Sequence, residues 1–130
     1  MGKRVLVIDD EQGVRDAFVL ALEGSPYQVI AAASGEEGLA EARAAPPNLV
    51  FLDLRMPGMD GIETLRRLRQ IFPEVPVYVI TAFHQAYLDP LQRLRSEQVS
   101  FQLAQKPLGA QAIREITHGV LEGPEARDHG

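Results

Sequence analysis

LVFLDLRMPGMDG, residues 49–61, combines the pattern of a buried strand with the pattern of a loop and gives the clearest indication of the fold. Its first part is apolar without interruption up to Asp53, which is typical of a strand buried on both faces of a parallel sheet. Its second part contains a proline and two glycines, which predict a loop whose backbone can approach a ligand closely. The stretch therefore predicts a central strand that delivers a carboxylate into a loop-lined site.

Four further apolar runs lie on either side of this strand. With it they occupy residues 4–9, 27–31, 48–53, 76–81 and 99–103, and segments of helical pattern alternate with them. This alternation is typical of a βαβ architecture. The second and fifth runs are the more polar and should lie at the sheet edges. We predict an α/β fold, a flavodoxin-like doubly wound (βα)5 domain with a five-stranded parallel sheet in the order 2-1-3-4-5.

Several helix boundaries are visible in the sequence. Ser34 with Glu37 three residues later forms a capping box, which predicts a helix start at this point. Asp89 followed by Pro90 predicts an N-cap and a first-turn proline for the fourth helix.

Composition limits the possible classes of protein. The 130 residues carry a net charge of −5, are 45% hydrophobic and include no cysteine, which excludes disulfides, thiol nucleophiles and cysteine-based metal sites. The length fits one domain, predicted over residues 1–122, with a polar tail or linker over residues 123–130. No apolar run is long enough to span a bilayer, so we expect a cytoplasmic protein without membrane contact. The acidic balance argues against direct nucleic-acid binding by this domain.

Polar residues follow the apolar runs where ligands bind in open parallel sheets, beyond the carboxyl ends of the strands. Asp9 and Asp10 end the first run, Asp53 the third and Thr81 the fourth, and Lys106 follows the fifth. Three carboxylates without histidine or cysteine suit a hard cation such as Mg²⁺, for which Mn²⁺ could substitute. A carboxylate can also attack phosphorus while a metal and a lysine neutralise the phosphoryl oxygens. Asp53 is the best candidate nucleophile.

These elements together resemble the receiver domain of two-component response regulators. The resemblance covers about residues 3–121 and lies in VLVIDDE at 5–11, LVFLDLRMPGMDG at 49–61, VIT followed by Ala82, and the Lys-Pro pair at 106–107. It implies that Asp53 accepts a phosphoryl group from a sensor histidine kinase or a histidine phosphotransfer protein. The domain would then act as a Mg²⁺-dependent switch that transfers and slowly loses its own phosphoryl group, rather than as an enzyme.

The resemblance also assigns roles to the residues around Asp53. Asp10, Asp53 and the backbone carbonyl of Arg55 would hold Mg²⁺, and Asp9 would act mainly through bound water. The residues implied to contact the phosphoryl group are Thr81, Ala82 and Lys106, and the peptide bond between Lys106 and Pro107 is a candidate cis bond. A downstream partner would bind through about residues 90–121, a surface through which receivers also form homodimers.

Two features depart from the receiver pattern. The switch pair would be Thr81 and Leu103, where receivers usually have an aromatic residue at the second position. Phe101 should share a face with Leu103 but does not occupy the switch position. The distance from Thr81 to Lys106 is also longer than expected, and the excess falls in residues 82–88.

Three alternatives remain open at this point. The altered switch position suggests a receiver-like interaction module that signals without phosphorylation, although such a module has no need of three clustered carboxylates. An aspartyl phosphatase or phosphotransferase commonly has a second aspartate two residues after the nucleophile, where this chain has Arg55. A flavodoxin-type nucleotide binder would need a glycine-rich phosphate loop after the first strand, and this turn is acidic.

Overall fold

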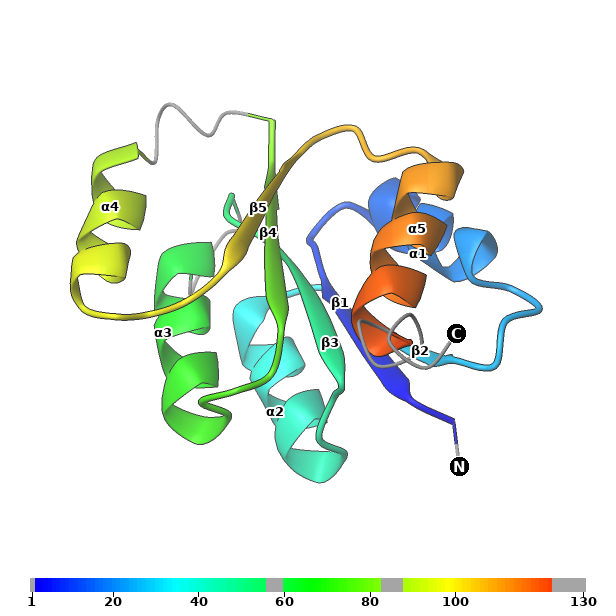
Figure 1. The fold of residues 1–130 in the computed structure, drawn as a ribbon, viewed down its shortest axis with the longest axis horizontal. Helices are drawn as coiled ribbons and strands as arrows, with labels where there is room; N and C mark the ends of the chain where they lie inside the picture. Colours follow the sequence, from blue (N-terminus) through cyan, green and yellow to red (C-terminus); the bar gives the residue numbers. More distant parts are fainter. Residues whose placement is uncertain (1, 56–59, 83–87, 123–130) are drawn as a thin grey trace.

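The structure, a computed structural model, describes residues 2–55, 60–82 and 88–122, and its centre is a five-stranded parallel sheet (Figure 1). The strand order is β2-β1-β3-β4-β5, as the sequence predicted. The strands are β1 (Arg4–Ile8), β2 (Gln28–Ala32), β3 (Leu49–Asp53), β4 (Val77–Thr81) and β5 (Gln102–Gln105). The predicted tail over residues 123–130, and residues 83–87 of the long loop, lie outside the described residues.

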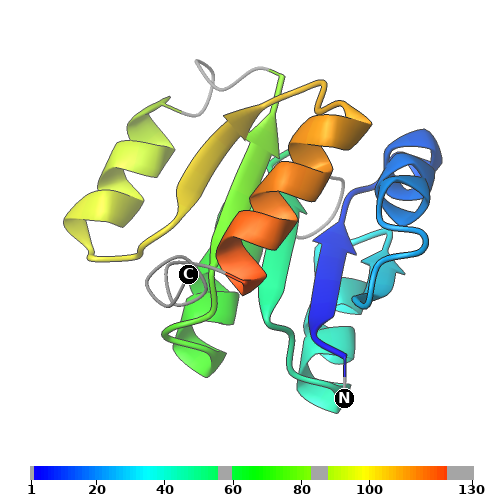
Figure 2. The same cartoon turned by 45° about the vertical axis from the view of Figure 1, so that its right-hand side comes forward.

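Helices cover both faces of the sheet (Figures 1 and 2). They are α1 (Gln12–Ala21), α2 (Gly35–Ala44), α3 (Gly61–Ile71), α4 (Leu88–Ser96) and α5 (Ala110–Leu121). The contacts between α1 and α5 place this pair on one face, whereas α2, α3 and α4 follow one another across the other.

Two apolar clusters, one on each face, hold the layers together. The strands supply alternate residues to them: Val50 and Leu52 face the cluster with α2, α3 and α4, whereas Leu49 and Phe51 face the cluster with α1 and α5. All five residues of β3 are buried. The continuous apolar run is thus explained, because a strand covered on both sides has no solvent-facing position.

The starts of α2 and α3 are capped by side chains that accept hydrogen bonds from free backbone N–H groups. The hydroxyl of Ser34 accepts a hydrogen bond from the Glu37 N–H (3.1 Å), as the predicted capping box requires. Asp60 caps α3 in the same way, accepting from the Glu63 N–H (2.9 Å). The prediction for α4 was wrong in detail: the helix begins at Leu88, so Asp89 lies in its first turn and is not the N-cap. Pro90 is tolerated because first-turn N–H groups have no partner within the helix.

The fifth strand begins three residues later than predicted, at Gln102 instead of residue 99. The N–H of Val99 donates to the Leu94 carbonyl (2.9 Å), closing α4 through a left-handed Gln98 (φ 65°). Phe101 is buried with α3 and α4 before the strand starts. Leu103 pairs with Val79 of the same cluster, so it lies on the same side of the sheet as Phe101, but it is 43% exposed.

The start of α3 lies against the loop that follows Asp53. The N–H of Gly61 donates to the Leu54 carbonyl (3.1 Å), and a Cβ at Gly61 would stand 2.4 Å from Leu54 Cα and 2.5 Å from the Asp53 carbonyl oxygen. These are backbone atoms that cannot move aside alone. Position 61 therefore requires glycine for the close approach of α3 to β3.

We expect Gly61→Ala to lower the free energy of unfolding by about 2 kcal/mol, because the methyl group would push α3 off the end of β3. Gly119→Ala is the matched control, since a Cβ there meets nothing within 4 Å inside α5. The control should be unchanged or up to about 1 kcal/mol more stable. Urea unfolding followed by circular dichroism measures both, and equal stabilities of the two variants would contradict the close-approach argument.

Candidate functional site

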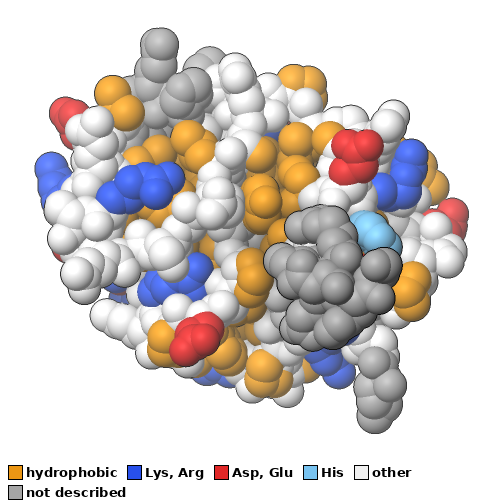
Figure 3. All heavy atoms as spheres, in the orientation of Figure 1, with side chains coloured by type: hydrophobic (Ala, Val, Ile, Leu, Met, Phe, Trp, Pro, Cys, Tyr) orange, Lys and Arg blue, Asp and Glu red, His pale blue; other side chains and the backbone are white. Residues whose placement is uncertain are grey.

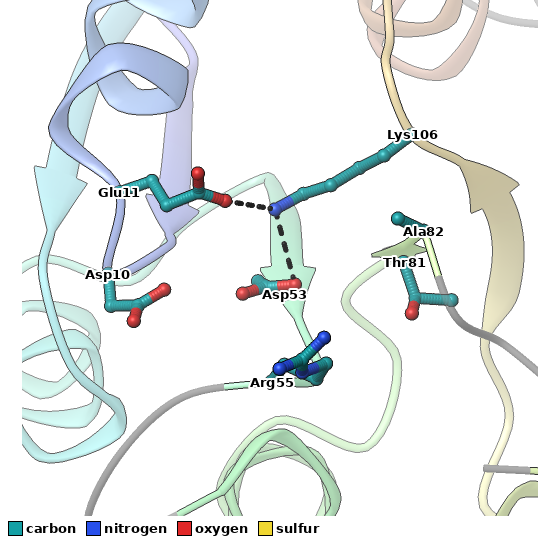
Figure 4. Close-up of a pocket in the computed structure, with 7 residues that line it drawn as sticks. All are labelled: Asp10, Glu11, Asp53, Arg55, Thr81, Ala82 and Lys106. Carbon is teal, nitrogen blue, oxygen red and sulfur yellow. Dashed lines mark hydrogen bonds and ion pairs between the residues drawn. The ribbon is translucent and has the colours of Figure 1, made fainter. Parts of the chain in front are cut away.

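The carboxyl ends of the strands bring the predicted site residues to one rim. Asp9 follows β1, Asp53 ends β3, Thr81 ends β4 and Lys106 follows β5. Because these four strands are neighbours in the sheet, residues separated by up to about a hundred positions in the sequence meet there. The pocket at this rim is lined by Asp10, Glu11, Asp53, Arg55, Thr81, Ala82 and Lys106 (Figure 4).

The ammonium group of Lys106 connects three carboxylates. Its Nζ atom lies 3.0 Å from Asp9 Oδ2, 3.2 Å from Glu11 Oε1 and 3.4 Å from Asp53 Oδ1. The side chains of Asp9 and Asp53 are 3% and 5% exposed, and that of Lys106 is 14% exposed. A buried carboxylate without a cation or hydrogen-bond donors strongly destabilises the folded state. The ammonium of Lys106 supplies the positive charge that Asp9 and Asp53 need when they are buried.

Backbone and side-chain contacts fix the turn after β1. Asp9 Oδ1 accepts a hydrogen bond from the Glu11 N–H (2.9 Å), and the Asp9 carbonyl accepts one from Arg15 Nη1 (2.8 Å). The Asp9 N–H donates to the Ala32 carbonyl (3.0 Å), extending the pairing with β2. Asp9 is therefore held in place, while Asp10 is exposed and faces the pocket.

The charges at the rim shift the proton affinities of Asp53 and Lys106. Burial, followed by the charge of Asp9, raises the pKa of Asp53 to about 6, although Lys106 and a hydrogen bond from the Arg55 backbone act in the opposite direction. Burial lowers the pKa of Lys106, but its bonds to Asp9 and Glu11 and the charge of Asp53 raise it more, so the net shift is upward. Asp53 therefore holds its proton unusually tightly for an aspartate, and Lys106 stays charged.

Asp9, Asp10 and Asp53 fit a divalent cation. Each offers a carboxylate oxygen, and these atoms lie within 4.8 Å of one another. A set of hard oxygen ligands suits Mg²⁺ or Mn²⁺. A bound cation would lower the pKa of Asp53 again, since a nearby positive charge favours the ionised form.

The remaining predicted residues lie at or near the same rim. Thr81 is buried, and its carbonyl accepts a hydrogen bond from the Lys106 N–H (3.1 Å). Arg55 and Ala82 line the pocket. The peptide bond between Lys106 and Pro107 is cis. Leu103 is absent from the residues that line this pocket.

One residue of this site had no role in the sequence analysis. Glu11 is the N-cap of α1, but its side chain makes no capping hydrogen bond with the described residues and pairs with Lys106 instead. Glutamate is a poor N-cap residue. An unfavourable N-cap residue could be recognised in the sequence once the start of α1 was known. The ion pair could not, because it depends on where β5 places Lys106.

The chain belongs to the response regulator receiver domain family, whose model matches residues 5–118. It is therefore a signalling domain of the two-component type, as the sequence predicted. Receiver domains of this family bind Mg²⁺ through clustered acidic residues.

Individual relatives agree with this assignment. Sporulation initiation phosphotransferase F of Bacillus subtilis is 33% identical over 93% of this chain and 95% of its own length. The alkaline phosphatase synthesis transcriptional regulatory protein PhoP of the same organism is 42% identical, but the match covers 63% of this chain and 34% of that protein. The chain thus spans about a third of the length of such transcriptional regulators.

Solved structures show the same fold. A CheY-like receiver domain protein from Methanospirillum hungatei matches over the full length of both chains, with a TM-score of 0.83 and 26% identity. The receiver domain of AraT from Geobacillus stearothermophilus gives a TM-score of 0.79 and 30% identity, over 98% of this chain and 99% of that one. Among the described residues, helices of the length and hydropathy needed to cross a membrane are absent.

The raised pKa of Asp53 predicts how stability depends on pH without a metal ion. The pKa of Asp53 is about 6 in the folded state and 3.8 in the unfolded chain, so the folded protein binds this proton more tightly. Its favourable contribution is complete below pH 3.8 and is lost as the pH rises through about 6. With a chelator present, the parent should lose up to about 3 kcal/mol relative to Asp53→Asn between pH 4 and pH 7. Urea unfolding of both chains measures this, and a difference independent of pH would contradict the prediction.

Proposed function

We propose that this domain accepts a phosphoryl group on Asp53 from the phosphohistidine of a sensor histidine kinase or a histidine phosphotransfer protein. One observation carries the proposal. Asp53 is the last residue of the central strand β3, its carboxylate lines the pocket, and Asp53 Oδ1 lies 3.4 Å from Lys106 Nζ. Membership of the receiver family supports it. Asp53 is a carboxylate that both ends a buried strand and lines the pocket, with carboxylate oxygens of Asp9 and Asp10 close by.

The transfer itself needs little from the protein beyond position and charge. One carboxylate oxygen of Asp53 forms a bond to phosphorus, the bond from phosphorus to the donor's imidazole nitrogen breaks, and the electron pair stays on that nitrogen. Lys106 neutralises the phosphoryl oxygens, and Thr81 and Ala82 contact them from the end of β4. Mg²⁺, held by Asp10, Asp53 and the Arg55 carbonyl with Asp9 acting through water, would supply further positive charge. Slow hydrolysis of the acyl phosphate resets the domain.

The output of the switch is conformational. A phosphoryl group that contacts Thr81 and Lys106 changes the relative free energies of two arrangements of the elements around them. The switch pair would be Thr81 and the half-exposed Leu103, and the partner surface would lie over about residues 90–121. Figure 3 shows hydrophobic side chains exposed between α4 and α5 on this side of the molecule. A protein partner or a second copy of the chain would bind there, without direct contact to nucleic acid.

Phosphorylation by a small donor tests the proposal. The protein is incubated with Mg²⁺ and acetyl phosphate, and its intact mass is measured beside Asp53→Asn. We expect one added phosphoryl group on the parent, removable with hydroxylamine, and none on the variant. Asp16→Asn, an exposed aspartate on α1, is the control and should be phosphorylated like the parent. Failure of the parent with acetyl phosphate and with several phosphorylated kinases would favour the alternative of an interaction module that signals without phosphorylation.

Metal binding gives a separate prediction. Mg²⁺ should raise the melting temperature at pH 7.5, and Mn²⁺ should replace it. Asp10→Asn removes one ligand charge from an exposed position and should weaken Mg²⁺ binding about tenfold or more while leaving the metal-free melting temperature unchanged. Asp16→Asn again serves as the control. Differential scanning fluorimetry over a Mg²⁺ titration measures these effects, and equal Mg²⁺ dependence of Asp10→Asn and the parent would exclude Asp10 as a ligand.

A further inference from the structure

Glu11 stands out among the described N-cap residues that carry a polar side chain. At the starts of α2 and α3 the N-cap side chains, Ser34 and Asp60, accept a hydrogen bond from a free backbone N–H of the helix. At the start of α1 the Glu11 carboxylate makes no such bond with the described residues. Where a residue gives up the favoured local interaction, a different interaction commonly explains it.

That interaction is the ion pair with Lys106. Glu11 Oε1 lies 3.2 Å from Nζ, and the Glu11 side chain is 65% exposed at the pocket mouth (Figure 4). An ammonium group has three N–H donors. The three carboxylates of Asp9, Glu11 and Asp53 lie within 3.4 Å of it, so each donor already faces an acceptor.

We infer that Glu11 is a positioning residue that restrains phosphorylation, because it competes with the incoming phosphoryl group for the ammonium of Lys106. The inference rests on the proposed function and adds a residue that sets its rate. A phosphoryl donor brings negative oxygens to Asp53, and they need the donors of Lys106. Glu11 occupies one of these donors and places a further negative charge beside the path of approach. Its removal favours the transition state, in which Lys106 faces the phosphoryl oxygens.

The contrast with the buried acids strengthens the argument. Asp9 is buried, is held by the Glu11 N–H and bonds Lys106 at 3.0 Å, so its charge is part of the folded site. Glu11 is largely exposed, so its carboxylate can be neutralised without leaving a buried charge unpaired. An exposed ion pair contributes little to folding. Glu11 can therefore be substituted to change the rate without loss of the site.

The test compares phosphorylation rates of intact protein with acetyl phosphate at a fixed Mg²⁺ concentration. Glu11→Gln keeps the size of the side chain and removes its charge, and we expect its rate constant to rise about three- to tenfold. Glu11→Asp keeps the charge on a shorter side chain and should stay within about twofold of the parent. Glu23→Gln removes an exposed charge from the turn after α1, at the other end of this roughly 15 Å helix, and should match the parent.

A double-mutant cycle separates competition for Lys106 from a general charge effect. In a Lys106→Gln background, with its folding first checked by circular dichroism, Glu11→Gln should no longer raise the rate, because the ammonium for which it competes is gone. An unchanged or lower rate for Glu11→Gln in the parent background would overturn the inference while the proposed function stands. A rise of equal size in both backgrounds would overturn it as well, since the effect would not pass through Lys106. Absence of phosphorylation in every chain would overturn the proposed function and this inference with it.

Discussion

The compensation of buried negative charge by the Lys106 ammonium is the interaction on which the site depends. Asp9 and Asp53 come from neighbouring strands and are both almost fully buried. Two such carboxylates repel one another, and the raised pKa of Asp53 reflects both this repulsion and the burial. Lys106, which follows the edge strand β5, reaches across β4 to both of them. The three strands are thereby connected at their carboxyl ends by charge as well as by the hydrophobic clusters.

The fold supplies the geometry that this compensation needs. In a parallel sheet the strands end at one edge, and loops rather than tight turns follow them, so side chains after each strand converge. The start of α3 packs at Gly61 directly against the backbone of Asp53 and Leu54 and so holds that backbone in place. The two apolar clusters bury the central strands on both faces, so the charged groups lie at the rim, outside the core. A phosphoacceptor needs this combination of a fixed carboxylate and an adaptable surrounding.

The N-cap residue of α1, Glu11, belongs to the charged site as well as to the helix. A residue suited to capping would have satisfied a free N–H group of the helix. The Glu11 carboxylate instead pairs with Lys106 and makes no capping bond with the described residues. The start of α1 therefore lacks a stabilising side-chain cap, and the pocket gains a negative charge. The proposed control of the phosphorylation rate would lie outside Asp9, Asp10 and Asp53, the acids that fit a metal ion.

The strand order, the edge strands and the rim residues other than Glu11 could be predicted from the sequence, because hydrophobic patterning reports burial and parallel strands share one carboxyl edge. The sequence placed β5 three residues early, because Val99 and Phe101 are apolar for a different reason: they close α4 and pack beneath it before the strand begins. It placed the start of α4 at Asp89 although the helix begins at Leu88. The pairing of Lys106 with Glu11, in addition to Asp9 and Asp53, became visible in the folded structure alone, since an ion pair between residues 95 positions apart depends on how the elements pack.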